Sequence, residues 1–424
     1  MTSEAARAAE HTRSIPRLLA VVFLPFAGGY FLSYLFRSTN AVIAPQLTAE
    51  IGLNAGDLGL LTSAYFLAFA SFQLPLGLLL DRFGPRRVQS ALLLSAALGA
   101  ALFAFGQSLT VLAIARGLIG LGVAGGLMAS FKAITLWFPK QRWPLINGCF
   151  MAVGGLGAIA ATSPLEAALH ITDWRGVFLA LAGITVIVAA VIRVVVPEKP
   201  RTDPIETFGG QLRVLRIIFT HRLFWRVAPL TVTTMAANLA IQGLWAGPWL
   251  SDVAGFGRDD VAVYLLGIAV AMTIGFVLTG ALADWCGRLG VGLMPVIGGI
   301  AVVFLLFQLA IVLELASTAL WPWIGFGVAA NGAALVYPLL NRYFPLRYAG
   351  RASTALNTLA FFGAFAGQYL LGAAIDLWPL TTDGRYQPDA FRAAFGGILV
   401  LEALALSWYL ISGGRHDPAA RETG

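Results

Sequence analysis

A single arginine lies in an apolar stretch near the start of the chain, and its neighbours give it a polar face. Tyr30, Ser33, Tyr34 and Arg37 follow i, i+3 and i+4 spacing, so a helix would bring them to one side. A guanidinium stays charged and donates a bidentate fork, which suits it to a planar anion. Because a charge in hydrocarbon is costly, it normally faces a cavity. The pattern predicts an anion-binding side chain in a cavity.

The alternative for this arginine is an anchor at the membrane surface. Arg37 lies 20 residues after Arg17, which is about 30 Å along a helix and close to the thickness of a bilayer core. Apolar residues continue beyond it from 41 to 44. This continuation favours the cavity.

Three other charged residues within predicted helices are candidates for a structural or functional role. Arg116 and Lys132 lie 16 residues apart on one helix, about 24 Å, and snorkelling would let both reach a surface. We expect Arg116 to be a structural charge at the outer end. For Lys132, substrate binding and a place at the cytoplasmic end both stay open. Glu166 is either a proton-coupling site or an interface carboxylate.

Uncharged runs of membrane-spanning length repeat along the chain. The 424 residues are 58% hydrophobic and 12% charged, with a mean hydropathy of +0.79. A bilayer core takes about 20 apolar helical residues, and the strict alternation of a β-barrel is missing from the pattern. The sequence predicts an all-α membrane protein with helices at 17–45, 58–80, 88–108, 113–138, 143–168, 174–196, 224–250, 260–283, 291–313, 318–342, 352–377 and 390–412.

The net charge of +7 reflects topology and does not indicate a nucleic-acid surface. Of the 28 Lys and Arg residues, 21 fall in the tails and alternate loops on one side of the predicted bundle, four in loops on the other, and three within helices. The positive-inside rule then places both termini in the cytoplasm. We expect a multi-pass protein of the cell inner membrane that has no nucleic-acid partner.

The residues that catalysis or cofactor binding would need are sparse. The two cysteines and four histidines offer no disulfide, metal or acid/base pattern, and no phosphate-binding loop of the G-x-x-x-x-G-K-[ST] kind occurs. We therefore expect no enzyme activity, no cofactor, no metal and no ATP hydrolysis.

The chain divides into two similar halves. "GLLLDRFGPRR" and "GALADWCGRLG" share Gly, Asp and Gly at a spacing of 203 residues. Paired six-helix halves are typical of transporters, which bind substrate between the halves. The predicted parts are a cytoplasmic tail, the N-terminal half, a linker with an amphipathic helix, the C-terminal half and a second tail, at 1–16, 17–196, 197–223, 224–412 and 413–424.

The first of these motifs resembles the signature loop of the major facilitator superfamily, and "RGLIGLGVAGG" resembles its helix-4 motif. The resemblance implies a gating role, with the aspartate of the loop acting across the interface between the halves. The residues concerned are Gly77, Asp81, Arg82, Gly84, Arg86, Arg87, Gly280, Asp284, Gly287 and Arg288.

A closer resemblance lies in the first helix. "SYLFRSTNAVIAP" followed by "GDLG" is similar to the organophosphate:phosphate antiporters and the organic-anion:cation symporters of that superfamily. The resemblance implies that Arg37 binds the phosphate or carboxylate of a substrate.

The C-terminal half departs from the antiporter pattern because the cores of its helices 7, 8, 10 and 11 contain no basic residue. A monoanion or a modest dianion, of carboxylate type, is therefore favoured over a phosphate ester. Uncharged polar and aromatic residues complete the candidate site and indicate a substrate with an apolar or aromatic body. They are Asn238, Gln242, Trp245, Tyr337, Asn357 and Gln368.

These features predict a monomeric secondary transporter that moves a small organic anion by alternating access, with protons as a possible coupling ion. A drug or metabolite exporter is the main alternative, although Ser163, rather than glycine, precedes Pro164 in helix 5. Nitrate transport is disfavoured because helices 2 and 8 lack arginine. A non-transporting receptor is disfavoured by the two gating loops.

Overall fold

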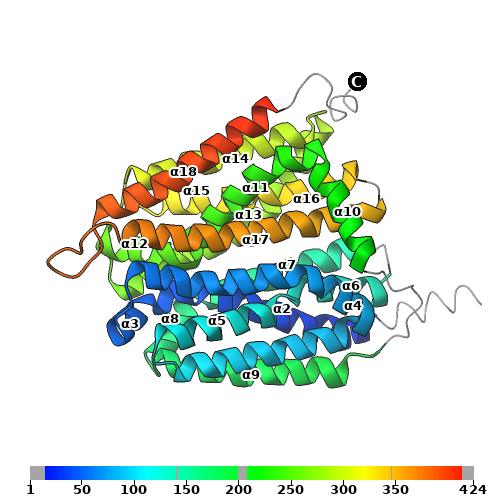
Figure 1. The fold of residues 1–424 in the computed structure, drawn as a ribbon, viewed down its shortest axis with the longest axis horizontal. Coiled ribbons are helices and arrows are strands. Elements are labelled where there is room, and N and C mark those ends of the chain that lie inside the picture. Colours follow the sequence, from blue (N-terminus) through cyan, green and yellow to red (C-terminus); the bar gives the residue numbers. More distant parts are fainter. Residues whose placement is uncertain (1–14, 140–141, 199–207, 345, 413–424) are drawn as a thin grey trace, which may run out of the picture.

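The computed structural model describes residues 15–139, 142–198, 208–344 and 346–412, and these form a helical bundle in two parts. The N-terminal half and the C-terminal half lie side by side, the first in blue to bluish green and the second in green to red (Figure 1). Twelve helices in these ranges are long and apolar enough to cross a membrane, and the described residues contain no strand. The predicted all-α fold is confirmed.

The N-terminal half follows the predicted spans, but several of them bend. The first predicted helix breaks at Thr39 and runs on to Ile51, and the fourth breaks after Val123. Its elements are η1 (Leu19–Phe23), α2 (Leu24–Ser38), α3 (Asn40–Ile51), α4 (Ala55–Phe105), α5 (Leu109–Val123), α6 (Gly126–Trp137), α7 (Trp143–Ala160), α8 (Ser163–Leu169) and α9 (Trp174–Val195).

The C-terminal half begins after α10, at the position of the predicted amphipathic helix. Its seventh span contains a π-helical turn that packs against α3 and α2 of the other half, and its tenth span contains a 3-10 segment. The elements are α10 (Phe208–Thr220), α11 (Arg222–Ala240), η3 (Ile241–Trp245), α12 (Ala246–Asp252), α13 (Arg258–Arg288), α14 (Leu293–Val312), α15 (Trp321–Ala329), η4 (Ala330–Leu335), α16 (Val336–Tyr343), α17 (Leu346–Ile375) and α18 (Pro388–Ile411).

One glycine turns the chain between the second and third spans. Gly84 has φ 77° and ψ 161° within α4, a region of the Ramachandran plot that is essentially open only to glycine. It lies in the loop motif, so the motif's glycine is required by backbone geometry.

The halves are joined tightly at the end where α4 and α13 begin, which we call the sealed end. There Glu166 pairs with Arg258, and Asp376 accepts hydrogen bonds from backbone amides of Ala55 and Gly56. The segments α3, α8 and α12 mark this end on the left of Figure 1, and α10 lies at the opposite end. By the distribution of basic residues, the sealed end is the predicted extracytoplasmic end.

Candidate functional site

Arg37 lies at the end of α2, next to the break that separates α2 from α3. The Thr39 hydroxyl donates to the Leu35 carbonyl at 2.6 Å within this turn. Side-chain bonds of this kind to the preceding turn often bend helices. The local sequence therefore sets both the bend and the position of Arg37 beside it.

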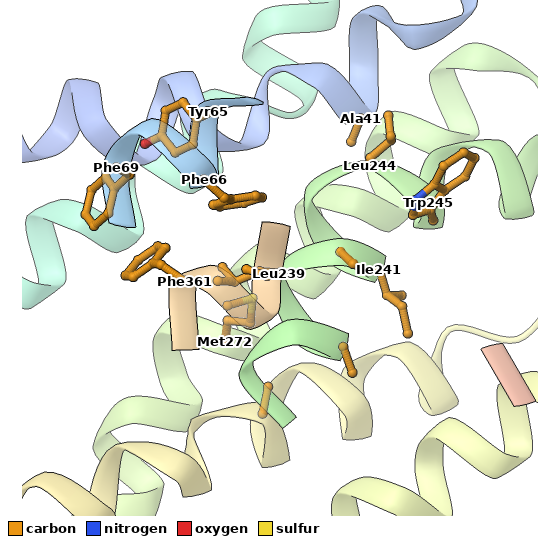
Figure 2. Close-up of a cluster of buried hydrophobic side chains, with 14 of the residues drawn as sticks. Ala41, Tyr65, Phe66, Phe69, Leu239, Ile241, Leu244, Trp245, Met272 and Phe361 are labelled. Carbon is orange, nitrogen blue, oxygen red and sulfur yellow. The ribbon is translucent and has the colours of Figure 1, made fainter. Parts of the chain in front are cut away.

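Three aromatic rings surround the Arg37 guanidinium. Its carbon lies 4.5 Å from the ring centroid of Tyr34, 5.4 Å from that of Phe361 and 5.8 Å from that of Phe69. Phe69 and Phe361 come from opposite halves and stand 4.2 Å apart between centroids, facing each other in Figure 2. Arg37 therefore lies at the interface between the halves.

The cation at this position lacks an anionic partner. Among the described residues no carboxylate forms an ion pair with Arg37, and its Nε–H is buried with no acceptor. Aromatic faces attract a cation, but they leave the in-plane Nε–H without an acceptor. An incoming anion would supply the missing acceptor.

The other N-terminal candidates extend from the arginine along α2. The Tyr30 hydroxyl donates to that of Tyr34 at 3.4 Å, so two phenols continue the polar face. Tyr65 donates to the Ser33 carbonyl at 3.2 Å, and the Ser33 side chain is buried. Tyr30, Ser33, Tyr34 and Arg37 thus form one polar strip.

Arg116 lies within the N-terminal half, where it ties two helices together. The residue is 1% exposed, and its guanidinium donates to the Phe36 carbonyl at 3.0 Å and lies over the rings of Phe103 and Phe178. The contact holds the residue directly before Arg37. This placement supports the predicted structural role.

Lys132 forms an ion pair with Asp81, which satisfies its ammonium group within the same half. The resemblance implied that Asp81 acts across the interface, and the structure instead shows it on this lysine. The nearby arginines behave similarly, because Arg87 pairs with Glu198 at 2.6 Å and Arg86 donates through Nε to the Arg193 carbonyl at 2.8 Å. The first loop motif therefore closes on its own half and the start of the linker.

The remaining residues of the two motifs lie on α4 and α13. Arg82 lies over the ring of Phe83, and the second copy occupies the last turns of α13. Besides Arg82, the remaining residues are Gly77 and Gly84 in the first motif and Gly280, Asp284, Gly287 and Arg288 in the second.

The C-terminal candidates fall into two groups. In the first group, Tyr337 donates to the Asn357 amide oxygen at 3.1 Å. Asn238 and Gln242 are both buried, on α11 and on the π turn η3. A π turn is frequent at functional sites.

The second group is packed into the contact between the halves. Gln368 and Trp245 are fully buried, and their neighbours on α17 and α4 come within van der Waals distance across the interface. The Gln368 carbonyl lies beside Gly59, and the Trp245 ring lies beside Gly372. Trp245 appears with Ala41 of the other half in Figure 2.

Sequence reasoning missed two residues of α4, Tyr65 and Phe69. They are four residues apart and so share a helical face, which is the signal that could have found them. Both lie next to α2, and Phe69 reaches the C-terminal half. Aromatic residues in a helix usually belong to the apolar core, so the residue types alone did not indicate that these two lie beside the candidate site.

Glu166 forms part of a charged contact across the halves. Its carboxylate is 6% exposed and lies 3.1 Å from an Arg258 guanidinium nitrogen, while His170 lies 3.3 Å from Asp259. Glu166, His170 and Asp259 offer three ligand atoms within 4.8 Å of one another. A metal ion there would have to displace Arg258 from the buried carboxylate.

The sequence of the chain is similar to those of known transporters. The chain is similar to a probable sulfoacetate transporter of Cupriavidus necator, at 25% identity over 60% of this chain and 62% of that protein. It is also similar to a putative tartrate transporter of Agrobacterium vitis, at 23% identity over 84% of each chain. The chain spans less than two thirds of the length of the first relatives that it matches.

The fold agrees with solved structures. The bacterial homologue of the human lysosomal transporter Spinster, in an inward-facing and unoccupied conformation, superposes with a TM-score of 0.75 at 17% identity, over 93% of this chain and 96% of that one. The family model of the Major Facilitator Superfamily matches residues 26–368. The chain belongs to the major facilitator superfamily.

Proposed function

We propose that the protein is a secondary transporter that carries a small organic anion across the membrane by alternating access. The observation that carries this proposal is Arg37, a guanidinium at the interface of the two halves that forms no ion pair with any described carboxylate and whose buried Nε–H is unsatisfied. Binding energy from an anion would be largest where the protein has left a cation without a partner.

The charge of the site supports a carboxylate of low charge. Lys132 is neutralised by Asp81 and Arg116 is bound to a backbone carbonyl, so of these three cations Arg37 is the one that remains for substrate. The relatives named as probable sulfoacetate and putative tartrate transporters agree with small acidic substrates. We therefore propose a monoanion or a modest dianion, in preference to a phosphate ester.

The aromatic rings around Arg37 support a substrate with an apolar body. Phe69 and Phe361 flank the guanidinium, and Tyr34 and Tyr337 add phenols from both halves. A carboxylate would meet the arginine while its body packed between the rings.

Proton coupling and a monomeric state are further parts of the proposal. Glu166 is a buried carboxylate whose partner, Arg258, belongs to the other half. Protonation would release that pair, so proton binding and opening of the sealed end would be linked. A Glu166→Gln protein in vesicles with an imposed pH gradient would lose gradient-driven uptake and keep exchange of unlabelled for labelled anion.

The direct test of the proposed function is a thermal-shift screen of the purified protein. The panel contains monocarboxylates, dicarboxylates, phosphate esters, nitrate and amphipathic cations. Stabilisation by carboxylates, followed by uptake of the best ligand into proteoliposomes, is the expected result. Stabilisation by cations alone would overturn the proposal in favour of an exporter, and stabilisation by nitrate alone would favour a nitrate transporter.

A further inference from the structure

The carboxylate of Asp376 connects the two halves at the sealed end. Asp376 follows the last residue of α17, and its two oxygens accept from the backbone amides of Ala55 at 3.0 Å and Gly56 at 2.6 Å. Those amides belong to the first turn of α4 in the other half. A negative charge at the start of a helix is favoured by the helix dipole and by the free amides of the first turn.

The start of α4 needs this carboxylate, because its own cap leaves two amides free. Asn54 and Asp57 form a capping box in which the amide of Asp57 is bound by Asn54 and the amide of Asn54 by Asp57. The amides of Ala55 and Gly56 lie between them and receive their acceptor from Asp376. One residue of the C-terminal half therefore completes a helix cap of the N-terminal half.

The backbones meet closely beside this contact. A Cβ on Gly372 would lie 2.4 Å from the Ala55 carbonyl oxygen, and one on Gly59 would lie 2.9 Å from the Gln368 carbonyl oxygen. Such approach is possible only between glycines and backbone. The Asp376 contact therefore lies beside closely packed backbones of the two halves, and this packing fixes the geometry of its hydrogen bonds.

The internal repeat shows that this contact is particular to one position. Asp173 stands 203 residues before Asp376, at the spacing that relates Asp57 to Asp260. Asp173 accepts from the Gly176 amide at 2.8 Å and caps α9 in its own half. The two aspartates make the same kind of bond, but only Asp376 makes it across the interface.

The same helix also reaches the candidate anion site. Phe361 of α17 packs on Phe69 of α4 and lies over Arg37, 15 residues before Asp376. A helix rises about 1.5 Å per residue, so the two contacts are about 22 Å apart on one rod. Both α4 and α17 therefore touch at the anion site and at the sealed end.

We propose that Asp376 is the lock of the sealed end: its carboxylate caps α4 from the other half and must be released before this end opens. The release transfers the amides of Ala55 and Gly56 to water, which can replace the lost acceptor. The lock therefore sets the balance between the conformations without preventing opening. This inference rests on the proposed function only in that a carrier must open at this end.

The test measures the distance between the halves directly, without substrate. Spin labels are attached to cysteines introduced at Ala49 and Thr382, exposed residues on either side of the seal, in a chain whose Cys149 and Cys286 are replaced by serine. Pulsed dipolar spectroscopy of the parent is expected to give one short distance. Asp376→Ala is expected to add a longer population.

Further variants separate the lock from general damage. Asp376→Asn keeps one acceptor oxygen and is expected to give a smaller open population than Asp376→Ala. Gly372→Ala pushes the same surfaces apart and is expected to open the seal while keeping the carboxylate. Asp173→Asn removes an equivalent cap within one half and is expected to leave the distance unchanged.

Each outcome decides the inference. Unchanged distances in Asp376→Asn and Gly372→Ala would overturn it, even if Asp376→Ala did not fold. A longer population in Asp173→Asn equal to that in Asp376→Asn would also overturn it, because cap loss alone would then explain the opening. Arg37→Ala in the same background is expected to keep the parent distance, so anion binding and the lock fail separately.

Discussion

In the N-terminal half Arg37 presents a guanidinium to the interface, whereas 203 residues later the C-terminal half has Ala240, which is fully buried. The N-terminal half supplies the charge, and Phe361, Tyr337 and Asn357 of the other half supply a ring, a phenol and an amide. One half is therefore equipped to recognise charge and the other to recognise the shape and hydrogen bonds of the substrate.

This difference also concerns the other cations of the N-terminal half. Lys132 and Arg116 are each given a partner within the half, an aspartate and a backbone carbonyl. Arg37, by contrast, lies among aromatic rings at the interface of the halves, and no ion pair joins it to a carboxylate in the described part of the chain. The number of basic residues in a helix bundle is therefore a poor guide to the charge available for a ligand.

Removing the charge of the N-terminal half is the largest expected perturbation. In Arg37→Ala, two charge-assisted hydrogen bonds worth about 3 kcal/mol together are lost, and carboxylate affinity falls roughly 100-fold. Thermal shifts across a ligand titration measure the change. Arg37→Lys keeps the positive charge but loses the bidentate pair of donors, so its carboxylate affinity is expected to lie between those of wild type and Arg37→Ala. Arg385→Ala, an exposed arginine, serves as the control, and equal stabilisation of wild type and Arg37→Ala would refute the assignment.

Adding a charge to the C-terminal half sharpens the comparison. Asn357→Lys places an ammonium beside Tyr337, and a second carboxylate could then bind it. One added charged hydrogen bond is worth about 1.5 kcal/mol, so the preference for dicarboxylates over monocarboxylates rises about tenfold. The ratio of the two dissociation constants measures it. Asn357→Gln is the uncharged control, and an unchanged ratio in Asn357→Lys would place Asn357 outside the site.

Truncating the aromatic wall is expected to have a smaller effect. Phe361→Ala removes the C-terminal ring over Arg37, and a cation–π contact of about 1 kcal/mol corresponds to a loss of affinity of roughly fivefold. The loss should be greater for arylcarboxylates than for acetate in the same titration. Phe362→Ala, its partly exposed neighbour on α17, provides the control, and equal losses in the two variants would mean that the ring has no place at the site.

The smallest expected effect belongs to a single hydroxyl. Tyr337→Phe deletes the donor to Asn357, a net contribution of about 0.7 kcal/mol, and affinity falls roughly threefold. Anion-dependent thermal stabilisation detects this change if the protein alone unfolds at the same temperature. Tyr369→Phe alters a tyrosine that is 41% exposed and should match wild type. A loss of affinity larger than that of Arg37→Ala would mean that the C-terminal half contributes more to anion binding than the charge of the N-terminal half does.

The membrane spans followed from the sequence because the bilayer imposes a local rule. About 20 apolar residues are needed to cross, and that requirement acts on each segment separately. The bends within the spans did not follow. The run from 17 to 45 reads as one helix, whereas the Thr39 hydroxyl bonds to the preceding turn and the chain breaks there.

The candidate site was predictable where it is local. Tyr30, Ser33, Tyr34 and Arg37 share one face because helical spacing alone decides it. Phe69 could not be assigned to the site, since a buried aromatic residue in the core and one that faces a cation look the same in sequence.

The sequence by itself determined which segments cross the membrane, which half carries the charge and which helix face carries Arg37, because hydropathy and periodicity are properties of neighbouring residues. Only the tertiary structure decided the partners. Lys132 contacts Asp81, which is 51 residues away in the sequence, and Asp376 contacts Ala55, which is 321 residues away. The first contact depends on how helices pack within one half and the second on how the two halves dock, and neither packing gives Arg37 an anionic partner in the described structure.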